Sequence, residues 1–153
     1  MTVNKKFPGG KNIGFVGEVK SVNGKILDTL LENDFIPVIA PIAIGDKYES
    51  YNINAHLCAS AIASKLKASK VIFLSDIRGV LDKESNLIGK LDKDSIEALK
   101  KDGTISGGMI PKVDACLECI QNGVGAAHII DGKIPHSLLL EIFTDEGIGS
   151  IIK

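Results

Sequence analysis

Two glycine-containing segments carry the residue types that a phosphate site needs. Residues 74–82, LSDIRGVLD, join an apolar strand to a polar turn, and residues 103–112, GTISGGMIPK, place glycines before a helix that carries Lys112. Glycine allows close approach of a backbone, the first turn of a helix has unpaired N–H groups, and lysine adds a positive charge. The two segments together therefore indicate a site for a nucleoside triphosphate.

This site would differ from the common nucleotide-binding loops. The sequence contains neither GxxxxGK[ST] nor GxGxxG, so the P-loop and Rossmann interpretations lose their usual motif support. Phosphoryl transfer requires mainly positioning and charge neutralisation, which lysine, glycine amides and a carboxylate can supply. Lys112 could act on an anion together with the helix dipole, or it could be a solvated surface lysine.

Short polar side chains follow the expected strand before the first of these segments. Ser75 and Asp76 end that strand, where open α/β sheets bind ligands, and Gly79 allows the turn to tighten. A serine–aspartate pair at this place can equally be an ordinary turn or helix cap. In YNINAH, Asn52 and Asn54 could bind a substrate or fix a loop, and capping is the favoured role for Asn54.

The histidines give no pattern of catalysis or metal binding. His56, His128 and His136 are widely spaced, without metal-ligand spacing or a partner serine, and GxSxG is absent. His128 lies between alanines and isoleucines, which favours a core position over a catalytic one. We predict no metal site.

The cysteines favour a reducing, intracellular setting. Their number is odd, and the opening sequence MTVNKKFPGG has no apolar stretch for a signal peptide. Cys116 and Cys119 have CxxC spacing but lie in a helical pattern, so packing thiols are favoured over redox or metal ligands. No apolar run reaches the length of about 18 residues that a membrane span needs.

Composition indicates one globular α/β domain. The chain has 153 residues, of which 44% are hydrophobic, and its 18 basic and 19 acidic residues give a net charge of −1. This balance provides no electrostatic case for nucleic acid or an anionic membrane, and it favours small-molecule partners. The abundance of Val, Ile and Leu suits a buried parallel sheet.

The hydrophobic pattern alternates between strands and helices. Residues 1–12 are polar and turn-rich, and we expect a flexible segment there. We expect strands over residues 13–22, 35–44, 71–76, 125–131 and 147–153. Helices are expected from Asn23 to about 33, after Asn54, from Asp94 to Gly103, over 108–122 and from Pro135, with a small hairpin at 82–86. This order predicts a largely parallel sheet with helices on both faces.

Several motifs together resemble one known family. They are GFVGEV (14–19), FIPVIAPIAIG (35–45), YNINA (51–55), LSDIRGVLD (74–82), ISGGMIPKV (105–113) and HSLLLEIFTDEGIGS (136–150). SDxxGVxD is typical of the amino-acid kinase superfamily, and the set as a whole resembles the C-terminal half of N-acetyl-L-glutamate kinases. The resemblance covers residues 13–153, which we interpret as a nucleotide-binding domain.

The resemblance implies a fold and a reaction. The fold is a three-layer αβα sandwich around a mainly parallel sheet, whose C-terminal half binds ATP with Mg²⁺ and whose N-terminal half binds N-acetyl-L-glutamate. The implied reaction transfers the ATP γ-phosphoryl group to the side-chain carboxylate of acetylglutamate, in arginine biosynthesis. It also implies a cytoplasmic or plastid-stromal location and a homo-oligomer once the enzyme is complete.

The same resemblance assigns roles to individual residues. Lys112 would stabilise the transferred charge, and Asn52 would hold the acylamino acid. A tail containing His136, Glu141 and Gly147 would contribute to an inhibitory arginine site. The residues that would surround ATP are Ser75, Asp76, Ile77, Arg78, Gly79, Val80, Leu81, Thr104, Ile105, Ser106 and Met109.

Two departures from the family pattern matter. The family's N-terminal half, with a strand-borne lysine, glycine-rich turns and a substrate-binding arginine, has no counterpart here. The family also has an aspartate that orders the catalytic lysines, and His56 stands at that position. Imidazole cannot supply this negative charge, so we expect weaker catalysis.

Two functions from different classes follow. The first is an ATP-binding kinase portion that binds nucleotide without turnover until a companion half is present. The alternative is a non-catalytic remnant that senses arginine or docks a partner, either the N-terminal kinase half or a signalling protein. Another carboxylate or carbamate kinase is disfavoured by YNINA and LLLEIFTDEG.

Overall fold

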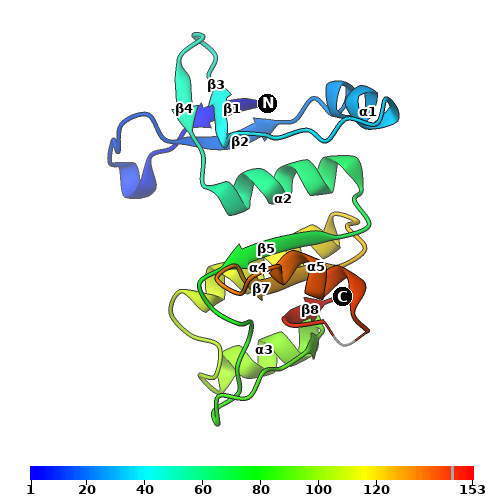
Figure 1. Ribbon diagram of the computed structural model, residues 1–153. Helices are drawn as coiled ribbons and strands as arrows, with labels where there is room; N and C mark the ends of the chain where they lie inside the picture. The colour runs from blue at the N-terminus through cyan, green and yellow to red at the C-terminus, as the bar shows by residue number, and fades with distance from the viewer. Residues whose placement is uncertain (146) are drawn as a thin grey trace. The chain divides into compact units, whose positions relative to one another are not determined.

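The structure is a computed structural model that describes residues 1–145 and 147–153 (Figure 1). It contains two compact units, Met1–Leu66 and Lys67–Lys153, where chain length alone predicted one domain. Each unit combines a sheet with helices, which confirms the α/β class. Within the described residues, no helix is both long and apolar enough to cross a membrane.

The first unit contains a four-stranded sheet with the strand order β2-β1-β3-β4. Its strands are β1 (Thr2–Lys5), β2 (Gly17–Ser21), β3 (Ile42–Ile44) and β4 (Ser50–Asn52). Its helical elements are the short 3-10 helix η1 (Pro8–Gly10), α1 (Lys25–Glu32) and α2 (Ala55–Leu66). β1 pairs antiparallel with β2 and parallel with β3, and β3 and β4 form an antiparallel hairpin.

Residues 1–12 were expected to be flexible, but the structure places a strand within them. This strand, β1, lies between β2 and β3 in the sheet. Val3 is only 1% exposed and packs in one cluster with Ala43, Tyr51, Ile53 and Cys58. The apolar alternation in MTVNK is too short to be recognised alone. Its partners come from β2 and β3, so distant residues determine that it becomes a strand.

The run 35–44 was expected to be a central strand, but only its end, β3, pairs with other strands. Residues 35–41 form an extended connection between α1 and β3, drawn without an arrow in Figure 1. Pro37 and Pro41 lack the N–H group that a ladder needs, which limits local pairing.

The second unit contains a four-stranded sheet with the strand order β5-β7-β8-β6. Its strands are β5 (Val71–Ser75), β6 (Lys90–Leu91), β7 (Ala127–Asp131) and β8 (Ser150–Ile152). Its helices are α3 (Lys93–Lys101), α4 (Met109–Gln121) and α5 (Ser137–Phe143). β5 pairs parallel with β7, and β6 with β8, as expected for a parallel arrangement, whereas β7 and β8 run antiparallel.

β7 and α4 supply the core of the second unit. Ile129 and Ile130 of β7 are fully buried, as are Val113, Cys116 and Cys119 of α4. Desolvation raises the pKa of the Cys116 thiol to about 12. All three cysteines are buried as thiols, as expected for packing residues.

Capping residues set two of the helix starts. The Asn54 side chain accepts hydrogen bonds from the backbone N–H groups of His56 and Leu57, as predicted for the start of α2. Asp92, rather than the expected Asp94, caps α3, because its carboxylate and the Ser95 side chain form a reciprocal capping box. The N-cap therefore lies two residues earlier than the sequence interpretation placed it.

Candidate functional site

The two phosphate-site segments line one cavity in the second unit. The loop after β5 and the segment before α4 enclose a volume of about 500 Å³, within the range of about 300–1,000 Å³ typical of small-molecule sites. The lining residues are Asp76, Ile77, Gly79, Val80, Leu81, Asp82, Ser85, Thr104, Ile105, Ser106, Gly108, Met109 and Lys112. Most of the residues expected around ATP are therefore brought together.

Lys112 is held at the carboxyl end of β5. Its ammonium group donates hydrogen bonds to Ser75 Oγ at 2.6 Å and to Asp76 Oδ1 at 3.2 Å. The hydrogen bond from Lys112 is the largest cause that lowers the pKa of the Asp76 carboxyl. Hydrogen bonds from the Asp76 backbone N–H and from the Ser75 hydroxyl lower this pKa further. These contacts give the lysine a defined position beside the cavity, in place of the solvated surface role.

The start of α4 adds to the positive character of the cavity. Gly107 has a φ of 53°, and Gly108 occupies the N-cap position without a side-chain cap. Gly108 and Lys112 both line the cavity, so the positive end of the helix dipole and the Lys112 ammonium both favour an anion there. An anion entering the cavity would meet both.

Gly79 lies where a side chain would be strained and would crowd both Ser150 of β8 and Leu87. Its φ is 148°, and a Cβ there would lie 2.6 Å from Ser150 Oγ. The Val80 N–H donates to Ser150 Oγ at 2.8 Å, and the Ser150 hydroxyl donates to the Ile88 carbonyl at 2.7 Å. Ser150 thus ties the cavity loop to β8. Ser150 was not selected from the sequence. The feature that could have indicated its role is a polar serine within an apolar strand.

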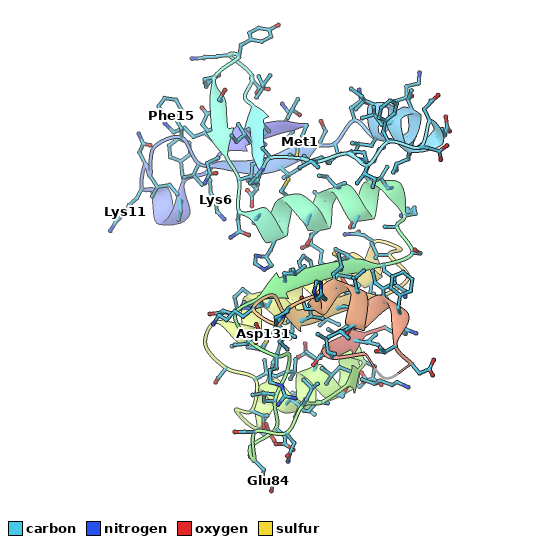
Figure 2. All side chains as sticks on the ribbon, in the orientation of Figure 1. Met1, Lys6, Lys11, Phe15, Glu84 and Asp131 are labelled. Carbon is cyan, nitrogen blue, oxygen red and sulfur yellow. The ribbon has the colours of Figure 1, made fainter. Side chains whose placement is uncertain are left out.

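The predicted hairpin at 82–86 closes the far end of the cavity loop. The Asp82 carboxylate accepts hydrogen bonds from the backbone N–H groups of Glu84 and Asn86 and from the Asn86 amide, and the bonds from Asn86 lower the Asp82 pKa. Leu81 and Leu87 form an antiparallel bridge, which confirms the hairpin. Figure 2 labels Glu84 at its tip.

A second lysine, Lys133, reaches the same sheet end. Ser75 and Asp131 are paired at the carboxyl ends of β5 and β7, and Figure 2 labels Asp131 there. Lys133 follows β7 and donates from Nζ to the Asp76 carbonyl at 3.3 Å. Sequence reasoning did not select it. The feature that could have indicated Lys133 is its position directly after β7, a strand that runs parallel to β5.

Among the residues predicted for ATP binding, substrate binding and catalysis, Ser75, Arg78, Asn52 and His56 lie outside this cavity's lining. Arg78 is exposed on the loop and does not line the cavity. Asn52 and His56 belong to the first unit: the Asn52 N–H donates to the Phe15 carbonyl, and the His56 N–H donates to Asn54 Oδ1. Their roles in substrate binding and catalysis remain predictions.

The tail expected to form an arginine site contains a buried carboxylate. Glu141 of α5 accepts hydrogen bonds from the N–H groups of Ile148 at 2.7 Å and Gly149 at 3.1 Å. A Cβ at Gly147 would lie 2.8 Å from Glu141 Oε2, so these two predicted residues are adjacent. The Glu141 carboxylate thus already accepts hydrogen bonds from backbone groups of the same chain.

The histidine beside Glu141 is not the one selected from the sequence. His128 Nδ1 lies 2.6 Å from Glu141 Oε1, and His128 is buried, as its apolar neighbours predicted. His136 instead occupies the N-cap of α5, with a φ of 60°. His136 was selected because it lies in the same sequence motif as Glu141. In the structure, α5 packs against β7, and this packing brings His128 of β7 to the Glu141 carboxylate.

The cavity does not contain a dedicated metal cage. Among the described residues, no group of three or more His, Cys, Asp or Glu side chains is arranged to hold a metal ion. Asp76 and Asp82 nevertheless place two carboxylates on the cavity lining. Mg²⁺ commonly uses one or two carboxylates together with substrate phosphates, so the donor set fits a metal that enters with a nucleotide.

Curated relatives share high sequence identity with this chain. It is 74% identical over 140 residues to the acetylglutamate kinase of Campylobacter fetus, covering 92% of this chain and 50% of the relative. It is 70% identical over 145 residues to that of Campylobacter hominis, covering 95% and 51%. The chain therefore spans about half the length of the curated relatives it matches.

Solved structures share the fold. N-acetylglutamate synthase from Neisseria gonorrhoeae, solved with coenzyme A and L-arginine, matches with a TM-score of 0.90 at 21% identity, over 99% of this chain and 35% of that one. Carbamate kinase from Giardia lamblia, bound to AMP-PNP, matches with a TM-score of 0.64 at 21% identity, over 90% and 46%.

The family assignment follows from a direct sequence match. The profile of the Amino acid kinase family matches residues 2–131, which is most of the chain. This match includes the whole cavity lining described above. The chain belongs to the amino acid kinase family.

Proposed function

We propose that this chain is the ATP-binding portion of an acetylglutamate kinase. The reaction would transfer the ATP γ-phosphoryl group to the side-chain carboxylate of N-acetyl-L-glutamate, in arginine biosynthesis. The observation that carries the proposal is the cavity between the loop 76–82 and the start of α4, with Lys112 fixed at its side. High identity to acetylglutamate kinases supports the choice of substrate.

In this proposal the protein mainly positions phosphates and offsets their charge. The backbone of 76–82 and the start of α4 hold the nucleotide, and Lys112 neutralises charge that develops on the transferred group. Mg²⁺ bound to the ATP phosphates supplies further charge neutralisation. Lys133, anchored to the Asp76 carbonyl, adds a second cation at this sheet end.

The acceptor would need residues beyond this cavity. Asn52 is proposed to hold the acylamino acid, with further contacts from the half of the relatives that the chain does not match. Turnover by the 153-residue chain alone is therefore not expected. The bacterial relatives favour a cytoplasmic location over a plastid stroma, and the proposal includes a homo-oligomer of the completed enzyme.

Calorimetric titration of the chain with MgATP tests this function. We expect saturable binding, and Lys112→Ala should weaken it by about tenfold or more, since a charge-assisted contact is worth about 1.5–3 kcal/mol. Lys20→Ala is the matched control, because Lys20 also pairs with an aspartate, Asp46, at 3.0 Å but lies in the first unit. Absence of MgATP binding by the unmodified chain would contradict the proposal.

The alternative is a non-catalytic remnant that senses arginine or docks a partner. The adjacency of Glu141 and Gly147 and the presence of His56 favour it. Arginine should then raise the melting temperature while ATP leaves it unchanged.

The two functions also differ at position 56. In an enzyme completed with the missing half, His56→Asp should raise kcat at least tenfold if a carboxylate there orders the lysines. His56→Asn, which adds no charge, is the control. An unchanged kcat for His56→Asp would count against the role assigned to this position.

A further inference from the structure

An exposed salt bridge joins two segments of the second unit that lead into the cavity. Lys83 Nζ lies 3.2 Å from Asp102 Oδ2, and the two side chains are 65% and 48% exposed. Lys83 belongs to the hairpin at 82–86, and Asp102 is the C-cap residue of α3. The bridge therefore connects the hairpin to the beginning of the segment that precedes α4.

Both ends of this bridge adjoin the cavity lining. Asp82 and Ser85 line the cavity from the hairpin, and residues 104–106 line it from the segment after α3. Lys83 and Asp102 lie outside the lining. Separation of the two segments would therefore widen the cavity without removing a side chain that faces a ligand.

The Asp102 end of the bridge is held in place by its own helix and by Thr104. The Asp102 N–H donates to the Ala98 carbonyl at 3.0 Å. Asp102 Oδ1 accepts a hydrogen bond from the Thr104 N–H at 2.9 Å, which leaves Oδ2 to face Lys83. Hydrogen bonds from Thr104, and to a smaller extent from Lys83, lower the pKa of the Asp102 carboxyl to about 2, so it is charged at neutral pH.

The Lys83 end is easier to displace. Residues 83–86 are exposed. The backbone hydrogen bonds beside them stay within the turn, because the Ser85 N–H donates to the Asp82 carbonyl and the Asp82 N–H donates to the Asn86 carbonyl. Segments with few buried contacts open locally at a low cost in free energy. The bridge to Asp102 opposes such a movement of the hairpin.

An exposed ion pair is suited to controlling rates. Water and salt screen it, so it is weak enough to break and form again repeatedly. A pair that must break before a ligand passes slows the entry and the release of that ligand alike. The equilibrium affinity then changes less than either rate constant.

We propose that Lys83 and Asp102 are positioning residues that hold the two cavity segments together and thereby slow both the entry and the release of MgATP. The inference rests on the proposed nucleotide-binding function. Because neither residue lines the cavity, the pair acts through the spacing of the two segments.

Stopped-flow measurement of nucleotide exchange tests this inference. An N-methylanthraniloyl derivative of ATP with Mg²⁺ reports association, and a chase with unlabelled MgATP gives the dissociation rate constant. Lys83→Ala and Asp102→Asn each remove the bridge, and the asparagine keeps an Oδ1 acceptor for the Thr104 N–H. Lys101→Ala is the control, because it removes an exposed lysine at the end of α3 and leaves the bridge intact.

We expect each bridge variant to raise the association and dissociation rate constants about two- to fivefold, with a change in Kd of less than about twofold. The double variant should exchange nucleotide no faster than either single variant, because both substitutions remove the same contact. The Lys101→Ala control should leave the dissociation rate constant unchanged. Additive effects of the two substitutions, or faster dissociation with unchanged association, would overturn the inference.

The direction of the association change excludes simple electrostatic steering. Lys83→Ala makes the surroundings of the cavity more negative and Asp102→Asn makes them less negative, so steering of an anionic nucleotide would shift the two association rates in opposite directions. Opposite shifts, or unchanged rates with saturable binding, would overturn the role of the bridge and leave the proposed function standing. Absence of nucleotide binding by the unmodified chain would contradict the proposed function, and this inference with it.

Discussion

Two apolar segments of the molecule, 35–41 and β7, have opposite environments. Both contain branched apolar residues, and both were expected to lie in strands. β7 pairs with β5 on one edge and β8 on the other, and Ile129 is fully buried. The segment 35–41 lacks such neighbours among the described residues, and Val38 is almost fully exposed. The contrast shows that an apolar run becomes a strand where a partner strand pairs with its backbone, as β5 and β8 do with β7.

The largest expected effect is a test of this contrast by truncating one side chain in each segment. Ile129→Ala should lower the free energy of unfolding of the second unit by about 2–5 kcal/mol, because it leaves a cavity in a close-packed core. Val38→Ala should change the stability of the first unit by less than about 0.5 kcal/mol, because the side chain is 96% exposed. Urea unfolding of both variants measures the difference. Similar losses would contradict the contrast.

An intermediate effect is expected at β8, the neighbour of β7. Ser150→Ala removes the acceptor for the Val80 N–H and the donor to the Ile88 carbonyl, leaving buried polar groups unpaired. The cost should be about 1–3 kcal/mol, with weaker MgATP binding because the cavity loop loses its anchor. Ser69→Ala, outside the cavity lining, is the control in the same unit. Unchanged stability and nucleotide affinity would show that β8 does not support the loop.

The smallest effect concerns the exposed ion pair beside the cavity. The folded-state pKa of Asp76 is lowered chiefly by the hydrogen bond from Lys112. Its contribution to stability is therefore present above the unfolded pKa of about 3.9 and is lost as the pH falls through the lower folded value. Denaturant titrations between about pH 2 and 7 should show a smaller acid loss for Asp76→Asn than for the unmodified chain. Identical pH profiles would contradict this assignment.

Local signals in the sequence account for much of the second unit. The helical pattern of 108–122 predicted α4, the DKESN turn predicted the hairpin, and the glycines before Lys112 indicated the cavity lining. These features depend on neighbours within a few residues of one another. Periodicity and turn chemistry describe such features well.

The features that sequence reasoning missed depend on distant partners. β1 becomes a strand through contacts with β2 and β3, and Ser150 acquires its role from Val80, 70 residues earlier. Lys133 reaches Asp76 because β5 and β7 run parallel. A single sequence does not specify which strands become neighbours, so these contacts required the three-dimensional structure.

The hydrogen bond between Val80 and Ser150 also bears on the order in which the site can form during synthesis. Translation produces the cavity loop, α4 and Lys112 before it produces β8, which supplies the Ser150 hydroxyl that accepts the hydrogen bond from the Val80 N–H. The cavity loop of the nascent chain therefore lacks this hydrogen bond for as long as β7 lacks its β8 neighbour. The loop gains its final hydrogen bonds only once residues 150–152 have left the ribosome and entered the sheet.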